Sequence, residues 1–246
     1  MFPAARDAYR KVFRRAHVRY MRDMADFYGQ FWSHRGTVFD VGANQGEYSE
    51  MFASRGARVI AIEPNPGYAD RLAAISVNHN ILPVMHAIGA EPGKAVLNIC
   101  STPGYSTLLS TDSDWIAGSP DYAEVAWTGV AEVEINTIDQ VARKFGLPDF
   151  IKIDIEGFEL SALQGMTFDP RYLSFEFGAR RRDLGIECLR NMGARGYTFR
   201  PITGRDAKFV TDKWMDESDA IAWLSGFTTE QAEYGDMFCR SPATTP

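Results

Sequence analysis

The sequence predicts a doubly wound α/β fold, in which helices cover both faces of a mostly parallel sheet. Two apolar runs, at residues 37–41 and 58–63, enclose a glycine-rich turn and a helix-like stretch, which is the pattern of one strand–helix–strand unit. Apolar runs and amphipathic stretches then alternate along the chain. The last two runs, at residues 197–202 and 237–240, predict an antiparallel hairpin that closes the sheet. A chain of 246 residues suits one such domain.

The individual elements follow from the spacing of the apolar residues. We expect strands at residues 37–41, 58–63, 83–88, 95–100, 131–136, 150–155, 173–177, 197–202 and 237–240. We expect helices at residues 4–34, 68–78, 138–145, 159–164 and 186–192. The helix at 138–145 begins with a capping box, because Thr137 precedes it and Gln140 follows three residues later. The near-continuous apolar run at 150–155 is typical of a buried parallel strand.

The N-terminal segment is strongly basic. Residues 1–35 carry eight Lys and Arg residues against three acids, and the helix at 4–34 places arginines opposite its apolar positions. Three interpretations stay open: a cap helix with a solvated basic face, an arm that contacts an anionic substrate, and a contact within a homo-oligomer. We favour the cap helix.

Two segments lack a regular pattern. Residues 101–128 are rich in Ser, Thr, Gly, Asp and Pro but contain Trp115 and Trp127, which favours a lid or a substrate-binding loop over disorder. Residues 203–236 form an extended insert between the last two strands.

Bulk properties narrow the class of protein. A net charge of −6 argues against a general nucleic-acid binder. The three cysteines form no metal-binding pattern, so we expect free thiols in a reducing compartment. The first 20 residues are charged throughout and resemble no signal peptide, and no run of 18 apolar residues predicts a membrane span. We therefore expect a cytoplasmic protein.

The strongest functional signal is the turn after the first strand. Asp40 ends that strand, Gly42, Asn44 and Gly46 form the turn, and Glu63 ends the second strand. Glycines let the backbone turn tightly and let a ligand approach closely. An acid after the second strand can accept hydrogen bonds from two ribose hydroxyls. The pattern therefore predicts a nucleoside-containing cofactor.

The residue at the helix entrance helps to identify the cofactor. The dinucleotide fingerprint has a third glycine where this chain has Glu47. A carboxylate there would repel a pyrophosphate but would tolerate a sulfonium group, and Asp40 acts in the same direction. The turn thus favours S-adenosyl-L-methionine over NAD. An NAD-dependent oxidoreductase and a turn without any ligand are the less favoured alternatives.

A second acidic cluster follows the strand at 150–155. Lys152 and Asp154 are two residues apart on that strand and share a face, and Glu176 on the neighbouring strand is the best distant partner for the lysine. Asp154 and Glu156 lie where the carboxyl ends of parallel strands bind ligands.

Two roles compete for Asp154 and Glu156: a general base for an acceptor hydroxyl, or a structural network of lysine and carboxylates. We favour catalysis for these two acids. Oxygen ligands suit Mg²⁺, but no spacing demands an ion, so we expect no metal site.

His86 ends the third predicted strand and is followed by Ala87, at a position that would border an adenine. The imidazole could stack, donate a hydrogen bond or serve as the base. A plain polar residue at a strand end is the alternative.

Several motifs in order resemble the FkbM family of S-adenosylmethionine-dependent methyltransferases. They are Val38–Gly46, Ile62–Pro66, Tyr105–Leu109, Ile135–Asp139, Asp149–Glu159 and Phe175–Phe177. The lysine–acid–glycine–acid block within Asp149–Glu159 is the most specific. The resemblance covers roughly residues 37–177, so the N-terminal segment and the insert at 203–236 lie outside it.

This resemblance implies a Rossmann-like class I methyltransferase fold with a seven-stranded sheet, as a domain at 36–246 behind a helical extension at 1–35. It also implies O-methylation of a hydroxyl on a sugar, a glycan or a natural product. Asp40, Gly42, Asn44 and Gly46 would line the methionine end of the cofactor. Glu63 would bind the ribose hydroxyls, with Asn65 nearby. A cofactor-binding module without catalysis is the alternative.

Overall fold

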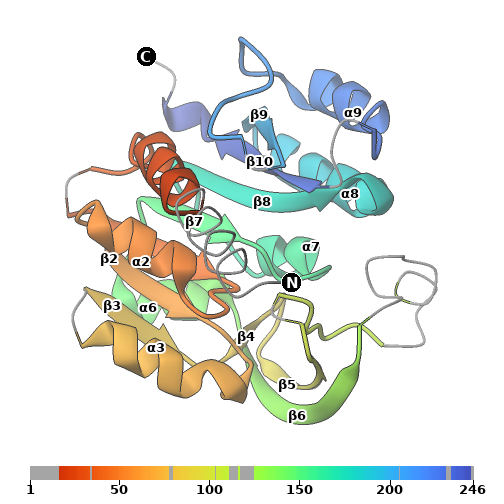
Figure 1. The fold of residues 1–246 in the computed structure, drawn as a ribbon. Coiled ribbons are helices and arrows are strands. Elements are labelled where there is room, and N and C mark those ends of the chain that lie inside the picture. The colour runs from red at the N-terminus through yellow and green to blue at the C-terminus, as the bar shows by residue number, and fades with distance from the viewer. Residues whose placement is uncertain are drawn as a thin grey trace, which may run out of the picture.

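A seven-stranded sheet forms the centre of the molecule (Figure 1). The computed structural model describes residues 17–33, 35–77, 80–102, 104–110, 116, 125–204, 206–230 and 234–244. The strand order is β3-β2-β1-β7-β8-β10-β9. These strands are β1 (Thr37–Val41), β2 (Arg58–Ile62), β3 (Ile81–Val84), β7 (Phe150–Ile153), β8 (Tyr172–Gly178), β9 (Thr198–Thr203) and β10 (Tyr234–Arg240). All pairs are parallel except those of β10, which runs antiparallel to β8 and β9, so the predicted class I fold and its C-terminal hairpin are confirmed.

Helices cover both faces of this sheet. The labelled helices are α2 (Glu47–Ser54), α3 (Ala69–Ser76), α6 (Ile138–Phe145), α7 (Glu159–Gln164), α8 (Arg182–Gly193) and α9 (Glu217–Ser225). One core cluster combines sheet residues with α2, α3 and the helix at residues 17–28, and the other combines them with α6, α7, α8 and α9. The capping box of α6 is confirmed, because the Gln140 N–H donates to Thr137 Oγ1 at 3.1 Å and the Thr137 N–H donates to Gln140 Oε1 at 3.0 Å.

The structure differs from the predicted elements at one strand. The run expected at 83–88 is divided between β3 and β4 (Ala87–Ile88), which belong to different sheets. The chain leaves the large sheet after Val84, and β4 pairs instead with β6 (Trp127–Asn136). With β5 (Gly93–Cys100), these strands form a separate three-stranded sheet, visible at the lower right of Figure 1.

The two segments without a regular sequence pattern, at 101–128 and 203–236, are described in part. The insert at 203–236 contains α9. The helix expected at 4–34 ends earlier than predicted, because residues 17–28 are helical and residues 29–33 form a turn. Residues 4–16 of that expected helix lie outside the described residues, as do Trp115 and half of the loop at 101–128. The cysteines are free and buried, as expected. In the described part of the chain, we find no helix with the length and apolarity that crossing a membrane requires.

Candidate active site

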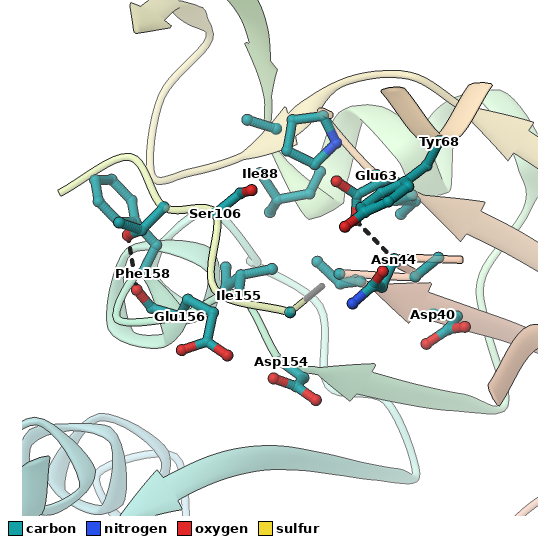
Figure 2. Close-up of a pocket in the computed structure, with 18 of the residues that line it drawn as sticks. Asp40, Asn44, Glu63, Tyr68, Ile88, Ser106, Asp154, Ile155, Glu156 and Phe158 are labelled. Carbon is teal, nitrogen blue, oxygen red and sulfur yellow. Dashed lines mark hydrogen bonds between the residues drawn. The ribbon is translucent and has the colours of Figure 1, made fainter. Parts of the chain in front are cut away.

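A pocket of about 340 Å³ lies at the carboxyl ends of β1, β2 and β7 (Figure 2). Its lining includes most of the residues that the sequence singled out: Asp40, Gly42, Asn44, Glu63, His86, Ala87, Asp154 and Glu156. The pocket has two walls with different acids. The β2 wall is formed by Asn44 and Glu63, and the β8 wall by Asp154, Glu156 and Glu176.

Glu63 is clasped by the backbone. Its Oε2 accepts a hydrogen bond from the Asn44 N–H and its Oε1 accepts one from the Asn65 N–H, each at 2.8 Å. Burial raises the pKa of Glu63 to about 7, although both hydrogen bonds act to lower it. Asn65 itself does not line the pocket. It supports Glu63 from behind, and its Oδ1 accepts the Gly67 N–H at 2.9 Å.

The two glycines of the turn have different structural roles. Gly42 lines the pocket with a φ of 88°, and a Cβ added there would lie 1.7 Å from the carbonyl oxygen of Asp154. Gly46 precedes α2 with a φ of 83°, and a Cβ there would lie 2.3 Å from Ile75 Cδ1. Only Gly42 reaches the pocket. Gly46 instead lets α2 pack closely against α3.

Asn44 offers a buried polar atom to a ligand. Its Oδ1 has no hydrogen-bond partner among the described residues, and its side chain lies beside Glu63 in Figure 2. A buried acceptor without a donor is unusual in a folded protein. Together with the Glu63 carboxylate and the acid at Asp40, it fits a nucleoside with hydroxyl donors at one end and positive charge at the other.

Asp40 and Lys152 form the floor between the two walls. They are register partners on β1 and β7, and both are buried. Asp40 Oδ2 accepts a hydrogen bond from Ser49 Oγ at 2.5 Å. Burial raises the pKa of Asp40 to about 6, against the lowering effects of Lys152 and Ser49. Lys152 Nζ donates to Asp154 Oδ2 at 2.6 Å and lies 4.7 Å from the centre of the Tyr48 ring.

The expected pairing of Lys152 with Glu176 is wrong. Glu176 Oε2 instead accepts a hydrogen bond from Arg181 Nη2 at 2.9 Å, and the same guanidinium lies 3.5 Å from Glu156 Oε2. The reason is local, because Lys152 donates to Asp154, directly after the end of β7, and Arg181 comes from the turn directly after β8.

The turn that carries Glu156 is fixed by a neighbouring acid. Glu159 is buried at the start of α7, and its carboxylate accepts the backbone N–H groups of Ile155 and Gly157, at 3.1 Å each. Glu156 itself has a φ of 53°, and its carbonyl oxygen accepts a hydrogen bond from Thr107 Oγ1 at 2.9 Å. Glu159 therefore holds the turn, and Thr107 fastens the segment at 104–110 onto it.

The β8 wall also brings together enough oxygen atoms for a cation. One oxygen from each of Asp154, Glu156 and Glu176 lies within 4.8 Å of the others. The guanidinium of Arg181 already neutralises part of this charge. The expectation of no metal site stays a prediction.

His86 and several unpredicted residues complete the lining. His86 Nδ1 lies 3.4 Å from Glu134 Oε2, and the ring lies on the pocket side of the turn between β3 and β4. Sequence reasoning gave no role to Tyr68, Ser106 and Phe158, which line the pocket as well. Ser106 and Phe158 lie within the motifs Tyr105–Leu109 and Asp149–Glu159, so the sequence held a signal for them, whereas Tyr68 lies in none of the quoted motifs.

Comparison with known proteins supports the same interpretation. The family model described as "Methyltransferase FkbM domain" matches residues 40–199. A curated relative, the hexuronic acid methyltransferase AglP of Haloferax volcanii, is 27% identical over 134 residues, which are 53% of this chain and 49% of that protein. The chain thus spans about half the length of that relative.

Solved structures of methyltransferases also show likeness to this chain. A TehB-like S-adenosylmethionine-dependent methyltransferase from Corynebacterium glutamicum is 13% identical, with a TM-score of 0.45 and coverage of 98% and 100% of the two chains. The plantazolicin methyltransferase BpumL, in complex with SAH, is 11% identical with a TM-score of 0.44, covering 97% and 91%. Because both TM-scores are below 0.5, the assignment depends on the family model, which matches more than half of the chain. The chain therefore belongs to the FkbM family of S-adenosylmethionine-dependent methyltransferases.

Proposed function

We propose that this protein transfers a methyl group from S-adenosylmethionine to a hydroxyl group of a sugar or glycan. The observation that carries this proposal is one pocket with two unlike walls: the backbone-clasped Glu63 on the β2 wall and the partly open carboxylates of Asp154 and Glu156 on the β8 wall. A sugar acceptor is favoured over other natural products because the curated relative is named as a hexuronic acid methyltransferase.

The β2 wall is assigned to the cofactor. Glu63 would accept hydrogen bonds from the ribose hydroxyls, and Asn44 Oδ1 would accept one further donor. Asp40, together with Gly42, would line the methionine end. Ala87 and His86, with Tyr68, would border the adenine, since they line the pocket beyond Glu63. When bound, S-adenosylmethionine supplies the electrophilic methyl group on a sulfonium.

The β8 wall is assigned to the acceptor. Asp154 would accept the proton that the acceptor hydroxyl loses as its oxygen forms the new bond to the methyl carbon. Glu156 would orient the hydroxyl, since its carboxylate lies on the same wall. Positioning the hydroxyl against the methyl group would supply most of the rate acceleration. His86 is the second candidate for the base, with its Nδ1 3.4 Å from Glu134 Oε2.

The test measures transfer of a tritiated methyl group from S-adenosylmethionine to a panel of simple acceptors. The panel contains methyl glucoside, methyl glucuronide and their disaccharides, and NAD is titrated in parallel as a competing cofactor. We expect turnover with at least one acceptor and no binding of NAD. Asp154→Asn should lower kcat about 100-fold, and Glu156→Gln less.

Three outcomes would contradict the proposal. Normal turnover in both variants would remove these acids from catalysis. Binding of the cofactor without transfer to any hydroxyl would favour a module without catalysis. Binding of NAD in place of S-adenosylmethionine would favour an oxidoreductase.

A further inference from the structure

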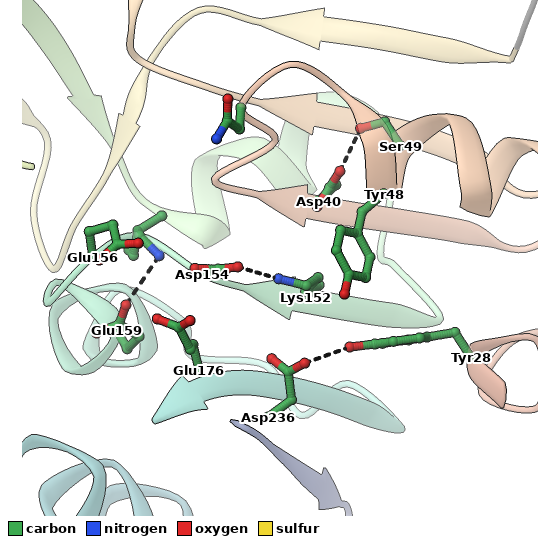
Figure 3. A network of polar contacts seen from close by, with 12 residues as sticks. Tyr28, Asp40, Tyr48, Ser49, Lys152, Asp154, Glu156, Glu159, Glu176 and Asp236 are labelled. Atoms are coloured by element: carbon green, nitrogen blue, oxygen red, sulfur yellow. Dashed lines mark hydrogen bonds and ion pairs between the residues drawn. The ribbon is translucent and has the colours of Figure 1, made fainter. Parts of the chain in front are cut away.

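Lys152 lies within a group of polar side chains on one face of the sheet (Figure 3). In one row across the strands, Asp40 is the register partner of Lys152, and Lys152 is the partner of Ser174. In the next row, Glu176 on β8 is the partner of Asp236 on β10. Side chains of register partners share a face, so Asp236 is on the same side of the sheet as Lys152.

Two residues outside the region that the family model matches, Tyr28 and Asp236, complete this group. Tyr28, from the helix at residues 17–28, donates a hydrogen bond from its hydroxyl to Asp236 Oδ2 at 3.0 Å. The hydroxyl of Tyr20, from the same helix, lies 2.8 Å from that of Tyr48, whose ring faces Lys152. The matched region covers residues 40–199, so neither Tyr28 nor Asp236 belongs to it.

The charges of this group do not cancel in pairs. Burial disfavours the charged form of Lys152, but Asp154, Asp236 and Asp40 together raise its pKa above the usual value, so the ammonium is present. Burial raises the pKa of Asp236, whereas Lys152 and the hydroxyl of Tyr28 act to lower it. Asp236 is not among the residues that line the pocket, so its charge acts on Lys152 from behind.

We propose that Asp236, held by Tyr28, is a positioning residue that balances the charge of Lys152 and so leaves Asp40 and Asp154 free to attract the sulfonium of the methyl donor. Without Asp236, the ammonium of Lys152 would neutralise much of the negative charge on the pocket floor. S-adenosylhomocysteine lacks the positive sulfonium, so the balance favours the substrate over the spent product. This inference rests on the placement of the cofactor in this pocket.

The experiment compares the affinities of S-adenosylmethionine and S-adenosylhomocysteine by isothermal titration, and it requires no acceptor. Asp236→Asn should raise the Kd of S-adenosylmethionine about tenfold, because one negative charge that faces Lys152 is removed. The Kd of S-adenosylhomocysteine should change less than twofold. Tyr28→Phe should shift the ratio of the two constants in the same direction by about threefold, because Asp236 loses a donor that favours its charged form.

Two matched controls separate this role from a structural one. Asp149→Asn removes the same charge at the opposite end of the sheet, where Asp149 accepts the Thr37 N–H at 2.8 Å. Tyr197→Phe removes a buried hydroxyl that donates to the Pro170 carbonyl at 2.8 Å. Both controls should leave the ratio of the two Kd values unchanged.

The remaining outcomes each decide the question. An unchanged ratio in folded Asp236→Asn or Tyr28→Phe, or equal weakening of both ligands, would overturn the inference. If Asp236→Asn does not fold, Tyr28→Phe carries the test, since an aromatic ring remains among Phe31, Phe52 and Phe238. Glu63→Gln tests the placement separately: if it weakens neither ligand, the placement of the cofactor fails rather than the role of Asp236.

Discussion

On the β2 wall of the pocket, backbone N–H groups hold Glu63, whereas on the β8 wall the guanidinium of Arg181 holds Glu156 and Glu176. Backbone donors are fixed in position by the fold and carry no net charge. A cation on a long side chain can be shared, displaced or left uncompensated. The difference fits the proposed roles, in which the β2 wall recognises one invariant ligand through geometry and the β8 wall depends on a balance of charges.

The largest expected effect concerns the cation shared by both walls. Lys152→Met should lower the free energy of unfolding by about 3–5 kcal/mol at pH 8, because buried carboxylates lose their cation. Chemical denaturation measures this loss. The matched control is Lys94→Met, which breaks an exposed ion pair with Glu132 and should leave the free energy of unfolding nearly unchanged. Equal losses in the two variants would show that the walls are not coupled through Lys152.

The next effect tests the geometric wall alone. Glu63→Gln should weaken the binding of S-adenosylhomocysteine about 30-fold, because the amide retains one acceptor oxygen where the carboxylate has two. Isothermal titration gives the affinity, and circular dichroism checks that the variant is folded. An affinity within threefold of the parent protein would refute the assignment of the β2 wall to the ribose.

The smallest effects are two pH dependences of opposite sign. As the pH rises, the stability of the free protein should fall, and its affinity for S-adenosylmethionine should increase. The pKa values of Asp40 and Glu63 are raised to about 6 and about 7 from ordinary values of 3.8 and 4.5. The folded protein therefore binds these protons more tightly than the unfolded chain. Their contribution to stability is complete below about pH 4 and is lost as the pH rises through 6 to 7.

We expect the Tm of the ligand-free protein to fall by about 3–6 °C between pH 6 and pH 8. Over the same range, the binding of S-adenosylmethionine should strengthen, because the carboxylates become charged. Differential scanning calorimetry with and without the cofactor measures both trends. Glu63→Gln should flatten the first trend, and a Tm that rises with pH in the free protein would contradict the raised pKa values.

The sequence predicted residues of both walls, including Asp154 and Glu156, but it did not predict how the acids of the β8 wall are paired. Glu63 and Asp40 were predicted because the two apolar runs and the glycine-rich turn between them can be recognised within one short segment of the chain. The partner of Glu176 was predicted wrongly because it depends on how far the side chain of Arg181 reaches, which spacing along the chain does not encode. The division of the run at 83–88 into β3 and β4 is of the same kind: its residues suit a strand, but pairing with β6 decides the sheet.

The contact between Gly42 and Asp154 has a consequence for redesign of the acceptor range. The glycine turn and the turn after β7 approach each other so closely that no side chain fits between them. A graft that moves the segment at 154–158 would also move the turn that we assign to the methyl donor. An engineer who wants a different acceptor should leave both turns untouched and vary the segment at 104–110, which closes the pocket and joins the β7 turn through Thr107.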